Sequence, residues 1–96
     1  MANKIQGKVI EVNDQGDLIT DIGPDQWSRA KHSSEIKVIV DDEHETFGLF
    51  ESNHEHPPMT LIAVTEADAP LKLHLVADSA SMMLGVRKGA TVQLVW

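Results

Sequence analysis

The chain has 96 residues, of which 42% are hydrophobic and 24% are charged, and its formal net charge is −7. This length is enough for one hydrophobic core, so we expect a single domain over residues 1–96. The absence of cysteine excludes disulfides, thiol nucleophiles and cysteine-ligated metals. The acidic balance disfavours nucleic acid and anionic membranes as partners, because like charges repel.

No apolar run approaches the roughly 18 residues that span a bilayer. The first residues also lack the charged and then apolar profile of a signal peptide. We therefore expect a soluble, cytoplasmic protein.

Strand signals dominate the first half of the chain. Residues 5–12 are rich in β-branched side chains, and the polar residues 13–17 form a turn before residues 18–22, which predicts a hairpin. Gly23 and Pro24 end the second strand, and a polar stretch through Glu35 predicts the longest loop. Residues 36–40 and 46–50 flank a turn at 41–43 and predict a second hairpin.

The second half adds three strands and one helix. Residues 59–65 are apolar on both faces and predict the most buried strand, residues 71–75 alternate, and residues 91–96 form the last strand. Asp78 or Ser79 caps a short helix over 80–84, and Gly85 stands at its C-terminal end. The pattern predicts a mostly β fold: a small β-barrel or sandwich of about seven short strands with one short helix before the last strand.

Three segments carry a family resemblance. Residues 7–22 read GKVIEVNDQGDLITDI, similar to G-x-V-x-x-I-D-x-F-G-N-L-x-T-N-I. The apolar strand near Leu61, continuing through Ser79 and Ala80, is similar to L-E-I-A-V-N-x-G-S-A, and residues 84–92, LGVRKGATV, are similar to L-G-x-x-x-G-D-x-V. In these motifs the chain resembles the C-terminal β-barrel domain of the S-adenosylmethionine hydroxide adenosyltransferase family, which includes the fluorinase and chlorinase enzymes.

The resemblance implies a half-site. In that family the active site lies between the N-terminal domain of one subunit and the C-terminal domain of its neighbour in a trimer. The N-terminal domain holds the ribose and the attacking water or halide, and we expect no counterpart of it in these 96 residues. The resemblance thus implies a homo-oligomer, by analogy a trimer, with S-adenosylmethionine or adenosine as ligand and no resident cofactor. The ligand-facing positions it assigns are Gln15, Asp17, Asp21, Ser79 and Ala80.

Several of these positions depart from the family pattern. The family's Phe-Gly-Asn is Gln15-Gly16-Asp17 here, Val76 replaces a strand-end asparagine, and Ala67 or Asp68 replaces a serine. An asparagine amide donates and accepts hydrogen bonds, as an adenine edge does, whereas an ionised aspartate only accepts. The base-stacking aromatic is also lost. The retained residues are mainly those of the fold.

Two other features allow a functional or a structural interpretation. His44, His54 and His56 lie near several carboxylates, and imidazoles at i and i+2 can share a metal, but these loops are also ordinary solvated turns. Trp27 lies in a polar stretch, where it either plugs the barrel end or forms a contact surface.

The sequence lacks a nucleophile elbow, a phosphate loop and a His-Glu-x-x-His helix, so we predict no catalytic residues. The leading hypothesis is a non-catalytic stand-alone module that oligomerises and binds a small adenosyl-like ligand or a partner protein. An alternative is the half-site subunit of a split S-adenosylmethionine-dependent adenosyltransferase or hydrolase, working with a separately encoded N-terminal-domain subunit. In that case Asp17→Asn should raise nucleotide affinity. A third hypothesis is a metal-responsive binding domain.

Overall fold

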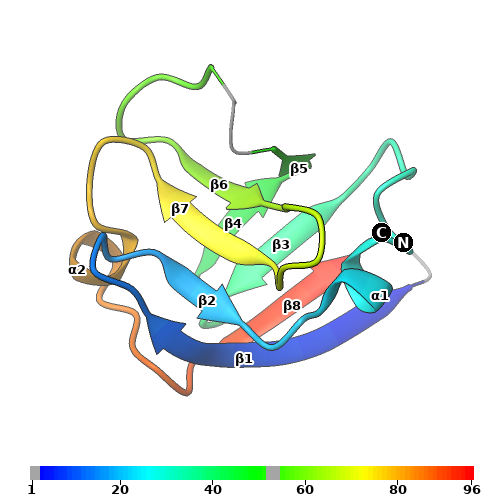
Figure 1. The fold of residues 1–96 in the computed structure, drawn as a ribbon, viewed down its shortest axis with the longest axis horizontal. Helices are drawn as coiled ribbons and strands as arrows, with labels where there is room; N and C mark the ends of the chain where they lie inside the picture. The colour runs from blue at the N-terminus through cyan, green and yellow to red at the C-terminus, as the bar shows by residue number, and fades with distance from the viewer. Residues whose placement is uncertain (1–2, 52–54) are drawn as a thin grey trace.

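A computed structural model describes residues 3–51 and 55–96. The strands are β1 Lys4–Val12, β2 Leu18–Thr20, β3 Lys37–Val40, β4 His44–Phe47, β5 Leu49–Phe50, β6 Leu61–Val64, β7 Lys72–Leu75 and β8 Thr91–Val95, and the helices are α1 Pro24–Trp27 and α2 Ala80–Leu84. The strands form one sheet in the order β4-β3-β8-β1-β2-β7-β6-β5, which curls into a nearly closed β-barrel (Figure 1). The mostly β fold predicted from the sequence is confirmed.

Both predicted hairpins are present, and the barrel closes where β4 meets β6. Strands β1 and β2 pair antiparallel, as do β3 and β4. Thr46 Oγ1 of β4 donates a hydrogen bond to Leu61 O of β6 at 2.7 Å. Gly48 then turns the chain with φ +84, and β5 pairs parallel to β6. The strand expected over residues 46–50 is therefore two strands, which raises the expected seven to the eight described.

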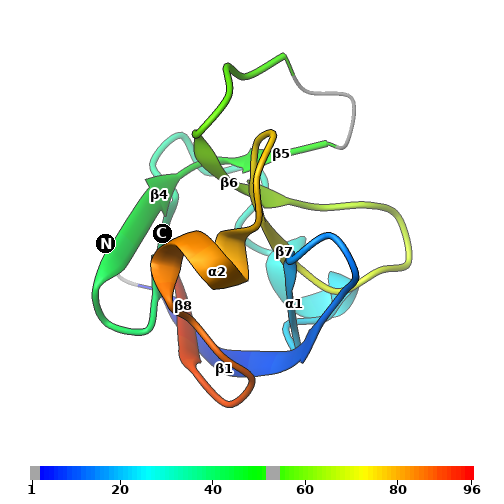
Figure 2. The ribbon, with the colours of Figure 1, turned by 90° about the vertical axis from the view of Figure 1, so that its left-hand side faces the viewer.

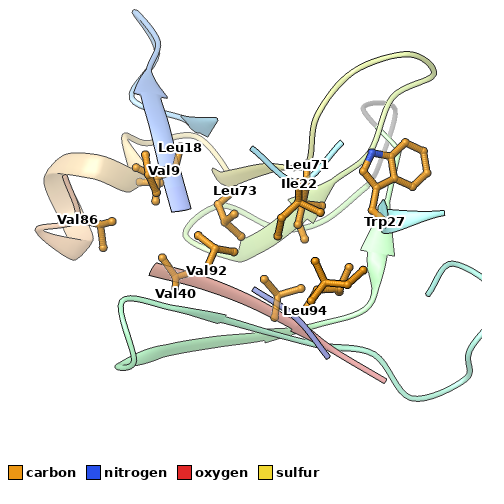
Figure 3. Close-up of a cluster of buried hydrophobic side chains, with 14 of the residues drawn as sticks. Val9, Leu18, Ile22, Trp27, Val40, Leu71, Leu73, Val86, Val92 and Leu94 are labelled. Atoms are coloured by element: carbon orange, nitrogen blue, oxygen red, sulfur yellow. The ribbon is translucent and has the colours of Figure 1, made fainter. Parts of the chain in front are cut away.

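The core fills the inside of the barrel. Leu18 of β2 pairs with Leu73 of β7, and both point inward beside Val92 and Leu94 of β8, all fully buried (Figure 3). Each such side chain contributes about 1.5–3 kcal/mol by leaving water. The inner face of the sheet therefore determines the fold.

Helix α1 lies within the stretch predicted as a loop, and that prediction was wrong here. Pro24 suits the first helical position because its ring fixes φ, and Gln26 Oε1 accepts the Gly23 amide at 3.1 Å. Trp27 is 6% exposed, and its indole nitrogen donates to Ala69 O at 2.9 Å. Trp27 therefore closes one end of the core, at the opposite end of the labelled cluster from Val86 (Figure 3).

Helix α2 matches its prediction. Ser79 is the N-cap and accepts the Met82 amide, and Gly85 ends the helix in the left-handed region with φ +68. The helix lies over the end of the barrel that faces the viewer in Figure 2, while α1 lies toward the other end (Figure 1). Neither helix in the described residues is long and apolar enough to cross a membrane.

Candidate functional site

A turn with several internal hydrogen bonds joins β1 to β2 at the α2 end of the barrel. Asn13 organises it: Asn13 Oδ1 accepts the amides of Gln15 and Asp17, both at 3.0 Å, and Asn13 O accepts the Gly16 amide at 3.0 Å. The Asn13 amide donates in turn to Asp17 O at 3.2 Å. An asparagine in this role substitutes for missing strand pairing, so the turn has one defined shape.

The turn packs directly on the start of α2. Gly16 has φ +83, and a Cβ built on it would overlap Ser79 Oγ and lie 2.9 Å from Ser79 Cα. The Ser81 amide donates to Gly16 O at 2.9 Å. Glycine is required at this position for both its backbone conformation and the close approach.

A shallow pocket of about 260 Å³ lies between the turn and the helix. We call it the turn pocket; its lining residues are Val12, Asn13, Asp14, Gln15, Gly16, Ser79, Ser81 and Met82. Gln15 and Ser79, two of the five ligand positions implied by the resemblance, are brought together here. The lining contains one acidic residue, Asp14, and no basic one, so it favours neutral or cationic ligands over anions.

Asp17 lies behind the turn, where its buried carboxylate joins Lys72 and His74 in what we call the ionic cluster. Its side chain is 1% exposed, and its Oδ1 lies 2.6 Å from His74 Nδ1. Its Oδ2 accepts from Asn13 Nδ2 at 3.2 Å and lies 3.9 Å from Lys72 Nζ. A buried carboxylate is costly unless it is paired and hydrogen-bonded, and these partners meet that need.

The carboxylate therefore faces β7, and Asp17 is not among the residues that line the turn pocket. At this position, where the motif that the chain resembles has asparagine, Asp17 contacts a histidine across the sheet.

The remaining two implied ligand positions have structural roles. Asp21 Oδ1 accepts the Lys8 amide of β1 at 2.9 Å, which extends the β1–β2 pairing past the end of β2. Ala80 is fully buried in the core. Neither residue lines the turn pocket.

The predicted metal ligands do not form a donor set in the described structure. His44 lies in β4, with its Nε2 4.0 Å from the Glu43 carboxylate, and the ring of His56 packs edge-on against Phe50 at 4.3 Å. His54 lies outside the described residues. Within residues 3–51 and 55–96, no three histidines or carboxylates are grouped closely enough to hold a metal ion.

Sequence reasoning missed the contribution of β7. The alternation of residues 71–75 correctly assigned Lys72 and His74 to the outer face, but nothing local links them to Asp17, more than fifty residues earlier. The link comes from the register, in which Leu18 pairs with Leu73 and Ile19 pairs with Lys72.

No family model matches the chain, and no curated protein matches it either. Among solved structures, an uncharacterized conserved protein from Thermotoga maritima matches with a TM-score of 0.78 and 19% sequence identity. The match covers 100% of this chain and 38% of the Thermotoga chain. At this identity the likeness shows the fold alone: the whole chain adopts the fold of a part of that longer protein.

Proposed function

We propose that the chain is a non-catalytic, cytoplasmic module that binds a small adenosyl-like ligand in the turn pocket and assembles into an oligomer. The observation that carries the proposal is the turn pocket itself. It joins Gln15 and Gly16 of the β1–β2 turn to Ser79 at the start of α2, and the resemblance assigns these two segments to the ligand.

The chemistry of the pocket suits a nucleoside better than an anion. The Gln15 side chain carries two amide donors and a carbonyl acceptor, so it can pair with a base edge that has both kinds of group. Because Asp14 is the charged residue in the lining, a cationic adenosyl compound such as S-adenosylmethionine gains attraction that adenosine lacks.

Two exposed methionines support assembly at this end of the barrel. Met82 is 84% exposed and lines the turn pocket, and Met83 is 53% exposed beside it on α2. Neighbouring exposed apolar side chains beside a pocket are typical of interaction sites, and methionine adapts to different partners. A second copy that covers Met82 would also close the open side of the pocket.

Isothermal titration with adenosine and with S-adenosylmethionine tests ligand binding. We expect saturable heat with both and tighter binding of the cationic compound. Gln15→Ala should weaken binding about tenfold, the factor that corresponds to one good hydrogen bond in a shielded site. Gln6→Ala, an exposed glutamine on β1, is the matched control and should bind as the parent does. No heat with either compound at millimolar concentration would remove the ligand from the proposal.

Light scattering after gel filtration tests the assembly separately. A trimer is the expected state, and Met82→Glu should shift it toward the monomer because it places a charge on the contact surface. A parent protein that remains monomeric at high concentration would contradict assembly.

A second candidate is the half-site subunit of a split adenosyltransferase or hydrolase. It is favoured by the coverage of the structural match, since this chain corresponds to 38% of a longer chain. Consumption of S-adenosylmethionine is then expected only after mixing with a separately encoded subunit that carries the remaining domain. Turnover by this chain alone would contradict it.

A further inference from the structure

A second pocket lies on the outer face of the sheet, on the other side of Asn13 from the turn pocket. We call it the lysine pocket; it measures about 160 Å³ and is lined by Asn13, Ile19, Val64, Glu66, Ala69, Pro70 and Lys72. Four of these side chains are apolar. This volume is below the roughly 300–1,000 Å³ of pockets for drug-sized ligands, so the pocket fits a smaller compound.

The register of three strands builds the centre of this pocket. Lys72 of β7 is directly opposite Ile19 of β2 on one side and Val64 of β6 on the other. The three side chains therefore form one row across the outer face, with the lysine between two apolar neighbours. Its aliphatic stem extends this apolar surface, and its ammonium group is the polar feature at the centre.

Two carboxylates attract the Lys72 ammonium group, but neither is close enough to accept a hydrogen bond from it. Its Nζ lies 3.9 Å from Asp17 Oδ2 and 3.7 Å from Glu66 Oε1, and both distances exceed hydrogen-bond length. The Lys72 side chain is 26% exposed, so the ammonium group reaches the pocket while Asp17 behind it is buried.

The charges around Lys72 select against ions. An anion attracted to the ammonium group meets repulsion from Asp17 and Glu66 at similar range, and a cation attracted to these carboxylates meets repulsion from Lys72 between them. A neutral carbonyl or amide oxygen avoids both penalties and still accepts a strong hydrogen bond from the ammonium group.

We propose that the lysine pocket binds a small, neutral, mostly apolar carbonyl or amide compound, with its oxygen on Lys72 Nζ and its apolar part on Ile19, Val64 and Pro70. This site goes beyond the proposed function, because it needs no adenosyl ligand and shares only Asn13 with the turn pocket.

Backbone amide shifts in nuclear magnetic resonance titrations of the whole chain test the proposal with three probes of similar size. Benzamide is neutral, benzoate is an anion and benzylammonium is a cation. We expect saturable shifts at Ile19, Val64 and Ala69 with benzamide and weaker ones with benzoate and with benzylammonium. Absence of saturable benzamide shifts there, or tighter binding of benzoate or benzylammonium than of benzamide, would overturn it.

Three variants assign the effect to Lys72. Lys72→Met keeps the apolar stem and removes the donor, so benzamide should bind about tenfold more weakly. Lys88→Met, an exposed lysine between α2 and β8, should bind benzamide as the parent does. Glu66→Gln removes one repelling carboxylate and should raise benzoate affinity several-fold, which keeps the test decisive even if Lys72→Met fails to fold. Unchanged benzamide affinity in Lys72→Met, or unchanged benzoate affinity in Glu66→Gln, counts against the proposal.

The two ligand hypotheses fail separately. Adenosine is expected to shift the amides of Gln15 and Ser81 in the turn pocket, whereas benzamide is expected to shift those of Val64 and Ala69. If one set of shifts is absent, the hypothesis for that pocket fails, and the other set still tests the hypothesis for the other pocket.

Discussion

The inner and outer faces of the β2–β7 pair both include fully buried side chains, but for different physical reasons. Leu18 and Leu73 on the inner face pack into the barrel core, and other side chains of similar volume would serve there. On the outer face, Asp17 is equally buried, but its place depends on a hydrogen bond with His74 and on the nearby charge of Lys72. Burial alone therefore does not distinguish the residues that hold the fold from those available for chemistry.

The largest effect is expected on the inner face. Leu73→Ala should lower the free energy of unfolding by about 3 kcal/mol, because it removes a fully buried side chain and leaves a cavity. Urea unfolding followed by tryptophan fluorescence measures it, since Trp27 lies in the same core. Lys72→Met, one residue earlier on the outer face, should cost much less. Equal losses of unfolding free energy in the two variants would show that the inner face does not contribute more to stability than the outer face.

A second large effect is expected where the outer turn meets α2. Gly16→Ala should destabilise by about 2–3 kcal/mol, because it combines a left-handed backbone with a Cβ that meets the Ser79 backbone. Gly85→Ala is the matched control: φ is +68 there, but a Cβ meets nothing within 4 Å. It should cost about 1 kcal/mol. The difference between the two in urea unfolding isolates the close contact from backbone strain.

A moderate effect is expected in the ionic cluster. Asp17→Asn keeps the shape but removes the carboxylate charge that faces Lys72 and strengthens the hydrogen bond with His74, so the free energy of unfolding should fall by about 1.5–2 kcal/mol. Thermal and urea unfolding measure the change in stability. Asp14→Asn, which alters an exposed carboxylate in the same turn, is the control and should leave the melting temperature and the urea midpoint unchanged.

This variant also tests the expectation drawn from the family motif. Since the side chain at position 17 faces β7, Asp17→Asn should not raise the affinity for adenosine. A gain in affinity would show that the turn rearranges to expose position 17, and the outer face would then be less rigid than the inner one.

Local patterns were sufficient to predict the inner face and the helix end. Alternation located the strands, and Ser79 and Gly85 marked the ends of α2 because capping and left-handed turns depend on single residue types. The outer cluster could not be predicted, since Asp17 and His74 are 57 positions apart and meet only through the β2–β7 register. Similarly, the break at Gly48 depends on barrel closure against β6, and α1 depends on Trp27 reaching the core and Ala69 O.

The smallest effect is expected at the helix cap. Ser79→Ala removes the acceptor of the Met82 amide and should cost about 1 kcal/mol in urea unfolding, while Ser34→Ala, at an exposed loop serine, should cost nothing measurable. Ser79 Oγ is also the atom nearest to a Cβ built at Gly16.

The double variant Gly16→Ala/Ser79→Ala should therefore be less destabilised than the sum of the two single variants, because the second change removes part of the overlap that the first creates. Simple additivity would show that the turn moves away from α2 at no cost. In that case the turn pocket would not have the fixed geometry that selective binding of an adenosyl ligand requires.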